Sequence, residues 1–578
     1  MRGHAVSDPT VGTRHGADIA EPPTHGDAAL PAPERSSSGW HRHLVWLLPI
    51  LVAALLGQMS VAMVTAAREQ SPVIDEVVYI GAAVVYTTRH DLQINAEHPP
   101  LGKLLLAGGL AFTDVKLKPT FQGTQMQIGG RVLYREGNDA DRVLFLARLP
   151  MIALTLLFGL VVFAFGRDLA GSTGGLAGLG LYAFSPDVIA HGSLATNDVP
   201  MAGFLLTSAW LLWRARGRPR PYLPLAALAF GCALATKMTA LVVVPVFVLL
   251  AGLSVWHAGR RATPVLVRPR VLSIAGAMAL FSVLAIATVW VTYLAVDPRL
   301  RFTTPSNAAP VDGLMGLAVH LLPLPEPYRD GLLVQITMEQ RLSGATLFGR
   351  HYDTSPWFYL PAAVLVKTPL GMLLLWPAGV VTVLAVRRLR PAAPYLLLPI
   401  GVLLLVSLSG DRGFGVRYVI WLPLFLAVAA ASTVVRQRRR WVLPAVFALV
   451  ALTGISSLRT FPYYLPYANE AFGGPSQTYR HLSDSNVDWG QDLRRLGIYL
   501  EEQWPGEPVW LIYKGRGDPE YYGIQARDPL KVPSDQVHGL LAVSATRIDF
   551  RKAHYRTMVG GRTPIAVIGH SIHVYLLP

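Results

Sequence analysis

Residues 44–66 read LVWLLPILVAALLGQMSVAMVTA, an apolar run without a single charged side chain. A second run of this kind, VLSIAGAMALFSVLAIATVWVTYLAV, occupies residues 271–296. Both are close to or above the roughly 20 residues that a helix needs to cross a bilayer. Because no soluble core needs several runs of this length, we predict a polytopic α-helical membrane protein.

The composition supports this fold class. Hydrophobic residues make up 52% of the 578 residues and charged residues only 15%, against about a quarter charged in soluble domains. The net charge of +15 is concentrated in short tracts between apolar runs, which indicates cytoplasmic loops of a membrane protein and no nucleic-acid partner. Cys232 is the only cysteine, so no intrachain disulfide can form.

The basic tracts also predict a topology. If the tracts at 214–220, 257–270, 387–390 and 436–440 are all cytoplasmic, an even number of spans separates each neighbouring pair. We therefore predict about eleven spans in the plasma (inner) membrane, with a cytoplasmic N-terminus and an extracytoplasmic C-terminus. The spans are expected near 44–66, 143–165, 170–190, 198–213, 222–236, 239–256, 271–296, 357–386, 394–409, 415–435 and 441–457.

This topology divides the chain into three parts. Residues 1–39 are polar, rich in Pro, Gly and Ala, and predicted to be a disordered cytoplasmic tail. Residues 40–457 form the transmembrane domain. Residues 458–578 mix polar residues with short β-like runs such as PVWLIY and PIAVIG and a helix expected around 487–503, which predicts a small extracytoplasmic α/β domain.

The first long outer loop carries two candidate motifs. Asp75 and Glu76 open the mostly apolar segment DEVVYIGAAVVY, which we expect to lie on the membrane as an interfacial helix. A solvated acidic pair is the ordinary alternative. The string NAEHPPLGKL follows at 95–104, with Glu97, His98 and Lys103 around the prolines that favour a helix start. A helix N-terminus with a nearby lysine can receive a phosphate, although a snorkelling lysine is the simpler alternative.

Three further charged residues lie at predicted outer mouths of spans. Asp198 begins the span after HGSLATN, where it is either a functional carboxylate or a helix cap. Lys237 follows Ala-Thr, and Arg417 enters an apolar span five residues after Arg412. Ionisable residues near membrane depth are costly and tend to mark function. Together, carboxylates beside cations on one membrane face indicate a substrate linked to a lipid phosphate.

These motifs resemble the protein O-mannosyltransferase family (glycosyltransferase family 39) of the C-type membrane glycosyltransferase superfamily. The resemblance rests on DEVVYIGAAVVY, NAEHPPLGKLLLAGG, Asn-Asp-Val-Pro and Ala-Thr-Lys in that order, and covers roughly residues 44–490. It implies a polyprenyl-phosphate sugar donor and inverting transfer of mannose or another hexose or pentose to a hydroxyl of a protein or glycolipid. The region after 458 does not resemble the β-trefoil repeats of the eukaryotic enzymes, and its DSNVDWGQD string resembles bacterial proteins placed loosely in the same superfamily.

The resemblance also assigns roles to the candidate residues. It makes Asp75 the catalytic acidic residue with Glu76 beside it, and it places Glu97, His98 and Asp198 in the same cavity. Lys103 and Arg417 would contact the donor phosphate, and Lys237 joins them as a cation at the outer mouth. From chemistry alone, Asp75 is our choice for the base that takes the acceptor proton.

A divalent metal held by Asp75, Glu97, His98 or Asp198 is chemically possible but not required. Three other functions remain open from the sequence. A transporter or flippase for lipid-linked sugars would need similar cations but would bind near the midplane. A glycan ligase would need a wider groove, and an adhesion surface would leave the carboxylates unexplained.

Overall fold

The computed structural model describes residues 39–261, 267–304, 313–339, 344–410, 412–436, 439–548 and 557–578. The tail predicted at 1–39 lies outside these residues except for its last position. The chain divides into two compact units at Leu48–Pro49, and apart from the first residues of α1 every feature discussed below belongs to the second unit. The predicted domain boundary at 457/458 stays a prediction.

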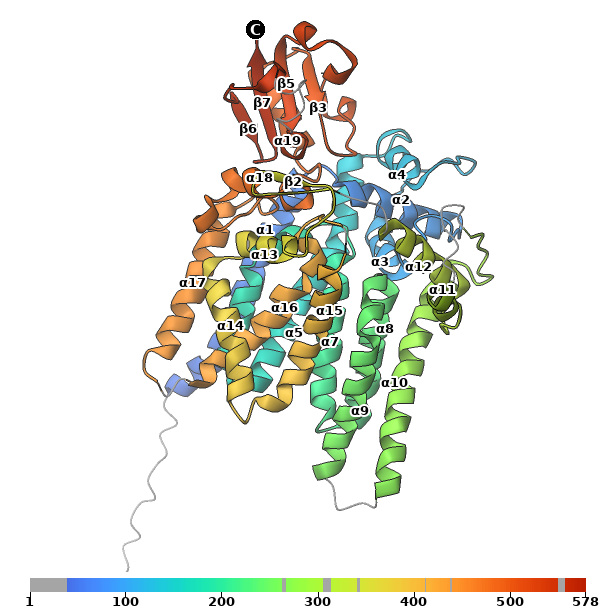
Figure 1. Cartoon of the computed structure of the whole chain (residues 1–578), viewed down its shortest axis with the longest axis vertical. Coiled ribbons are helices and arrows are strands. Elements are labelled where there is room, and N and C mark those ends of the chain that lie inside the picture. The colour runs from blue at the N-terminus through green and yellow to red at the C-terminus, as the bar shows by residue number, and fades with distance from the viewer. Residues whose placement is uncertain are drawn as a thin grey trace, which may run out of the picture. The chain divides into compact units, whose positions relative to one another are not determined.

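Helices make up most of the described chain (Figure 1). The long helices are α1 (Gly39–Glu69), α5 (Ala140–Ala183), α7 (Asp198–Ala215), α8 (Pro219–Thr236), α9 (Val244–Arg261), α10 (Val267–Val296), α14 (Leu370–Ala385), α15 (Ala393–Leu408) and α17 (Val442–Thr460). The shorter ones are α2 (Ile74–Thr88), α3 (Pro100–Leu110), α4 (Gln125–Tyr134), α6 (Pro186–Gly192), α11 (Gly313–His320), α12 (Glu326–Glu339), α13 (Tyr359–Lys367), α16 (Trp421–Ala431), α18 (Thr478–His481) and α19 (Leu493–Gln503).

The number of spans differs from the prediction. Among the described residues, six helices are long and apolar enough to cross a membrane, or seven if one bent pair counts as a span. The predicted spans at 143–165 and 170–190 both fall largely in α5, which consists of two helices joined by a kink at Ala170 and Gly171, at the predicted break between the spans. The predicted span at 357–386 is the bent pair, α13 and α14, in which the chain bends by 118° between the two helices. The count of eleven is therefore not confirmed.

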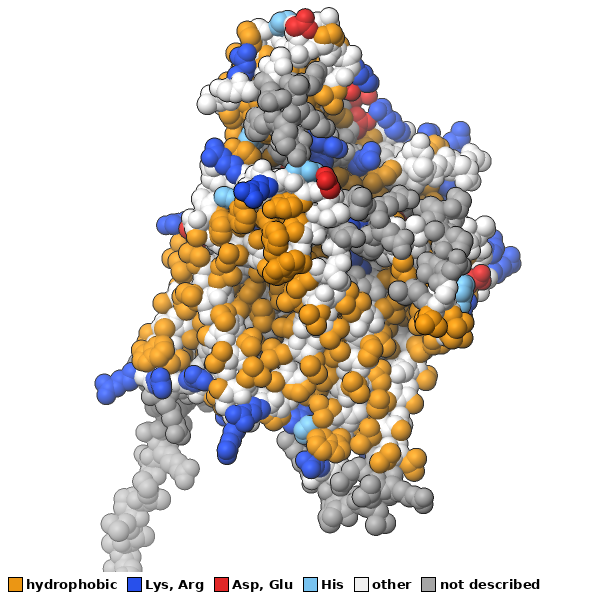
Figure 2. Space-filling model, viewed as in Figure 1, with side chains coloured by type: hydrophobic (Ala, Val, Ile, Leu, Met, Phe, Trp, Pro, Cys, Tyr) orange, Lys and Arg blue, Asp and Glu red, His pale blue; other side chains and the backbone are white. Residues whose placement is uncertain are grey.

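The surface of the helical part is apolar. Figure 2 shows hydrophobic side chains covering the helices, and several large ones are strongly exposed, including Val283, Val291 and Leu405. A water-exposed monomer rarely carries so extensive an apolar surface, whereas lipid tails cover it without cost. Multiple apolar helices with an apolar surface make this a multi-pass membrane protein.

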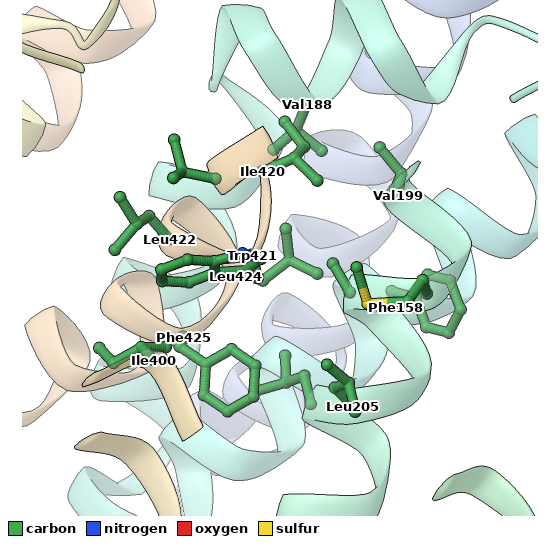
Figure 3. Close-up of a cluster of buried hydrophobic side chains, with 14 of the residues drawn as sticks. Phe158, Val188, Val199, Leu205, Ile400, Ile420, Trp421, Leu422, Leu424 and Phe425 are labelled. Atoms are coloured by element: carbon green, nitrogen blue, oxygen red, sulfur yellow. The ribbon is translucent and has the colours of Figure 1, made fainter. Parts of the chain in front are cut away.

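A buried cluster joins the helices beneath the polar end of the molecule (Figure 3). It brings Phe158 of α5 and Val199 of α7 together with Ile420 and Trp421 at the start of α16, all at most 3% exposed. Val199 directly follows Asp198, and Ile420 lies three positions after Arg417. This packing therefore fixes the elements that carry two of the predicted site residues.

The helix α2 is buried among other protein elements, and its predicted position at the membrane interface stays a prediction. Its residues from Glu76 to Tyr86 are all buried, and it packs against α3 and α4. The contact with α4 is a close backbone approach, because a Cβ atom on Gly81 would come 2.7 Å from the Cα atom of Gly129. Glycine at both positions allows this approach.

The C-terminal region contains α19 and a five-stranded sheet of order β4-β3-β5-β7-β6. Strand β3 (Val509–Ile512) is parallel to β4 (Ala526–Arg527) and to β5 (Gly539–Ser544), whereas β7 (Ile572–Leu577) is antiparallel to β5 and β6 (Ala566–Ile568). The runs PVWLIY and PIAVIG contain β3 and β6, as the sequence predicted. A separate hairpin, β1 (Ala345–Leu347) and β2 (Arg350–Tyr352), bridges to Leu482.

Candidate functional site

Two ion pairs lie at the end of the helices that carries α2 and α3. Arg417 Nη1 donates to Asp75 Oδ2 at 2.6 Å, and Lys237 Nζ donates to Asp198 Oδ1 at 2.5 Å. Asp75 lies in the first turn of α2 and Asp198 in the first turn of α7, where the helix dipole favours a carboxylate. The structure thus brings four of the predicted residues together in two opposite-charge pairs.

Aromatic rings connect the two ion pairs. The Tyr418 ring lies 5.4 Å from the Arg417 guanidinium carbon and 5.5 Å from Lys237 Nζ, so one ring faces both cations. The Trp489 ring lies 4.3 Å from the Arg417 guanidinium carbon. A cation over an aromatic face is stabilised by about 0.5–2 kcal/mol. We name the set Asp75, Asp198, Lys237, Tyr418, Arg417 and Trp489 the charged cluster.

The charged cluster is most open at Asp75. Its side chain is 27% exposed, against 12% for Arg417 and 5% for Asp198. No described residue donates a hydrogen bond to the second oxygen of Asp75. This oxygen is therefore available to accept a hydrogen bond from a bound molecule.

A segment far along the chain holds Arg417 in position. Gly415 has φ +114°, a conformation that favours glycine, and a Cβ there would lie 2.7 Å from Asn486 Oδ1. The same oxygen accepts a hydrogen bond from Val416 N at 3.0 Å, and Ser485 Oγ donates to Phe414 O. The loop that contains Arg417 is thus fixed by the residues just before Trp489.

Lys103 lies outside the charged cluster. Its side chain is fully buried, and its ammonium donates to Asn95 O at 2.9 Å, Asn95 Oδ1 at 3.1 Å and His98 O at 2.5 Å. Burial lowers the pKa of Lys103 to about 7, against a smaller opposing effect of Glu97. All three protons of a lysine ammonium have acceptors here. The contact of Lys103 with the donor phosphate stays a prediction.

The carboxylate of Glu76 is also fully hydrogen-bonded within the protein. Arg148 Nε and Nη2 donate to its two oxygens at 2.7 and 2.6 Å, and both side chains are fully buried. Val73 N and Ala195 N donate to the same carboxylate at 2.9 and 2.7 Å. These contacts fill the acceptor sites of the carboxylate. Glu76 therefore joins α2 to α5, whereas the sequence analysis placed it beside the base.

Glu97 and His98 lie in the turn that precedes α3. Gln125 Nε2 donates to Glu97 Oε1 at 2.9 Å. The His98 ring packs edge-on against the Tyr79 ring, with 5.5 Å between the ring centres. Burial, together with Lys237 and Lys103, holds the pKa of His98 well below its usual range. His98 is therefore a neutral imidazole at neutral pH. Its Nδ1 is buried and has no hydrogen-bond partner among the described residues.

The predicted metal ligands do not assemble into a metal site. Within the described part of the chain, no three His, Cys, Asp or Glu side chains lie close enough together to hold an ion. Asp75 and Asp198 instead pair with Arg417 and Lys237. Because cations already neutralise both carboxylates, the donor set does not fit the candidate divalent metal.

Several residues of the site were missed by the sequence analysis. Lys367 lies at the end of α13 and donates to Leu465 O at 2.6 Å and to Asn486 O at 3.1 Å. Its Nζ is also 3.3 Å from Asp187 Oδ1. The signal was a lysine followed by Thr-Pro inside an apolar run. Trp489 and Asn486 belong to the quoted DSNVDWGQD string, but nothing in that string alone assigned them to Arg417.

Comparisons with known proteins were made for the sequence and for the fold. The family model described as dolichyl-phosphate-mannose-protein mannosyltransferase matches residues 140–290. A comparison with curated protein sequences found no match. Among solved structures, ArnT from Cupriavidus metallidurans bound to undecaprenyl phosphate is 13% identical and has a TM-score of 0.44, with 93% of this chain and 98% of that chain covered.

Two further solved structures are similar. The Saccharomyces cerevisiae protein O-mannosyltransferase Pmt1-Pmt2 complex bound to the sugar donor is 18% identical with a TM-score of 0.33, covering 45% of this chain and 35% of that chain. The archaeal oligosaccharyltransferase AglB from Archaeoglobus fulgidus, in complex with an inhibitory peptide and a dolichol-phosphate, is 11% identical with a TM-score of 0.44, covering 88% and 70%.

The fold and the site define a multi-pass helical membrane protein with ion-paired charges gathered at one end of its helices. The family-model match over residues 140–290 confirms the resemblance to the protein O-mannosyltransferase family that the sequence motifs indicated. The matched segment contains Asp198 and Lys237, one of the two ion pairs.

Proposed function

We propose that this protein is a membrane glycosyltransferase that moves a sugar from a polyprenyl-phosphate donor to an acceptor hydroxyl with inversion. The observation that carries the proposal is the charged cluster itself. It holds an accessible carboxylate, Asp75, next to two cations, Arg417 and Lys237, at the mouth of apolar helices. The matched family is described by a phosphate-linked mannose donor, which agrees with this chemistry. The sugar is mannose or another hexose or pentose.

The chemistry assigns one role to each kind of side chain. The acceptor hydroxyl attacks the anomeric carbon from the face opposite the phosphate, and its proton passes to the Asp75 carboxylate. The bond between the anomeric carbon and the phosphate oxygen breaks, and its electron pair leaves with the polyprenyl phosphate. Arg417 and Lys237 stabilise the charge that grows on this phosphate, an electrostatic contribution of the kind that dominates many enzyme sites.

The orientation follows from the basic residues. Figure 2 shows Lys and Arg side chains at the end of the helices away from the C-terminal sheet. The junction between α7 and α8, the end of α9 and the segment between α14 and α15 all carry arginines. The positive-inside rule makes this end cytoplasmic. The charged cluster then faces the extracytoplasmic side of the plasma (inner) membrane, where a protein or a glycolipid supplies the hydroxyl.

The test is a transfer assay on the purified protein with a panel of radiolabelled polyprenyl-phosphate sugars and an extract of host proteins and glycolipids. We expect label to move to an acceptor from at least one donor, with the opposite anomeric configuration in the product. Retention of configuration would contradict attack by the acceptor itself. No transfer from any donor, combined with movement of intact lipid-linked sugar across liposomes, would make the protein a transporter.

A further inference from the structure

A groove of about 800 Å³ lies between the C-terminal sheet and the β1–β2 hairpin. Its walls include Thr346 and His351 from the hairpin, Tyr479 and Asp484 from the segment beside it, and Tyr513 and Arg547 from the sheet. The hairpin is fixed to this segment, because Phe348 N donates to His481 O at 2.8 Å. A groove of this size matches the pockets that hold small ligands, and none of its lining residues has a role in the proposed transfer step.

The groove lies at the carboxyl ends of two adjacent parallel strands. The residues that follow β3, such as Tyr513, and those that follow β5, such as Arg547, both line it. The strand order places β3 between β4 and β5. After β3 the chain therefore forms β4 on one side of it and then crosses to form β5 on the other side. In open α/β sheets, ligands bind in the crevice at such a reversal point.

The groove is lined by two arginines and two aspartates, and each aspartate has a lysine beside it. Asp484 is neutralised by Lys514, and Asp528 lies 3.9 Å from Lys531. Arg547 is exposed and forms no ion pair with any residue that the structure describes, and Arg480 is exposed beside the Tyr479 ring at 5.7 Å. The unmatched cations attract a negatively charged ligand, and the hydroxyls of Thr346 and Ser483 suit a ligand with many hydroxyl groups.

One chain segment runs from the groove to the charged cluster. Ser483 and Asp484 line the groove, and the same segment continues through Asn486, which holds the Arg417 loop, to Trp489, which covers Arg417. A ligand in the groove therefore lies against the chain segment that positions the phosphate-binding arginine. This continuity is what a binding site for the second substrate requires.

We propose that this groove binds the acceptor, and that the acceptor is a carbohydrate with negatively charged groups. The proposal rests on the function proposed above and names the substrate class of its second site. A peptide recognised by strand addition needs a free strand edge. Both edges of β3 and β5 are paired with neighbouring strands, so the large sheet offers a peptide no edge here. The outer edge of the hairpin strand β2 is the remaining place for strand addition, and the acidic-peptide probe below tests it.

The test measures binding to the full-length protein in detergent by isothermal titration, which does not depend on turnover. The probes are tetragalacturonate and mannose 6-phosphate as anionic carbohydrates, maltotetraose as a neutral one, and tetraglutamate as an acidic peptide. We expect an anionic carbohydrate to bind, maltotetraose to bind more weakly, and added salt to weaken the anionic complex. Absence of binding by both anionic carbohydrates, or equal binding of tetraglutamate, would overturn the proposal.

Two variants locate the binding site. Arg547→Ala should lower the affinity for the anionic probe about tenfold, which is the effect of losing one hydrogen bond to a charged group. Arg562→Ala removes an exposed arginine of the same region that does not line the groove, and it should leave binding unchanged. Equal affinity in Arg547→Ala and wild type would overturn the assignment to the groove. Asp75→Asn should bind the probe normally, so a failure of the transfer chemistry is distinguishable from a failure of the groove.

Discussion

Asp75 and Arg417 are 342 positions apart in the chain, and their side chains meet at 2.6 Å. Asp75 comes from the buried helix α2, and Arg417 from a short turn held by Asn486. The carboxylate and the guanidinium are thereby fixed against each other before any substrate binds. In the account proposed here, one supplies the base and the other receives the phosphate, and the predictions below separate these roles.

Replacing Arg417 with lysine should weaken donor binding and slow transfer by about tenfold, because a lysine keeps the charge but loses the planar stacking on Trp489 and Tyr418. The measurement is transfer rate against donor concentration in detergent. Arg459→Lys is the matched control, since Arg459 is exposed at the end of α17. Normal donor affinity in Arg417→Lys would show that the guanidinium does not contact the phosphate.

Replacing Arg148 with methionine should destabilise the protein by about 3–5 kcal/mol, because it leaves the buried carboxylate of Glu76 without its cation. Thermal unfolding in detergent measures this loss. The control Arg214→Met removes the partner of Asp168 in a half-exposed pair, which should change stability by only about 0–1 kcal/mol. An unchanged unfolding temperature with lost transfer would instead place Glu76 in the chemistry.

Lys103 and Lys237 should behave differently when each is replaced with methionine. Lys103→Met removes three hydrogen bonds to the Asn95–His98 turn, so we expect lower thermal stability and a donor affinity close to normal. Lys237→Met removes a cation of the charged cluster, so we expect weaker donor binding. Donor titrations on the folded fraction of each variant make the comparison. A larger loss of donor affinity in Lys103→Met than in Lys237→Met would show that Lys103 contacts the phosphate.

Asp488 should make stability depend on pH. Burial raises the pKa of Asp488 to about 7, although Lys514 opposes this shift. The folded protein then holds a proton that the unfolded chain releases near pH 4, so stability falls as the pH rises from about 4 through about 7. Asp488→Asn removes this loss, and its gain in unfolding temperature over wild type should be larger at pH 8 than at pH 5. A gain that does not change with pH would contradict the raised pKa.

The sequence located much of the charged cluster because its members lie at the ends of apolar runs. Asp198, Lys237 and Arg417 could be proposed on that basis, since a charge at the mouth of a span is costly without a purpose. The helix α2 and the strands β3 and β6 were predictable from local patterns. Motif order then brought Asp75 into the same set.

Contacts across long sequence distances were not predictable in this way. Glu76 reads like a partner of Asp75, but its cation is Arg148, 72 positions away in an apolar helix. Lys103 has the sequence pattern of a free cation at a helix start, but carbonyl oxygens of the preceding turn accept hydrogen bonds from its ammonium. The count of eleven spans is not confirmed, and the bend of 118° at Thr368–Pro369 within the predicted span 357–386 was not visible in its apolar pattern.

The most direct test of the account is transfer by Asp75→Asn, compared with wild type and with Asp114→Asn, which changes an exposed carboxylate of the same loop. The asparagine keeps the size of the side chain and removes the base. We predict that Asp75→Asn binds the donor but transfers at least about 100-fold more slowly, the usual contribution of a general base, whereas Asp114→Asn matches wild type. Equal transfer by all three proteins would contradict the account, because the carboxylate beside Arg417 would then have no part in the reaction.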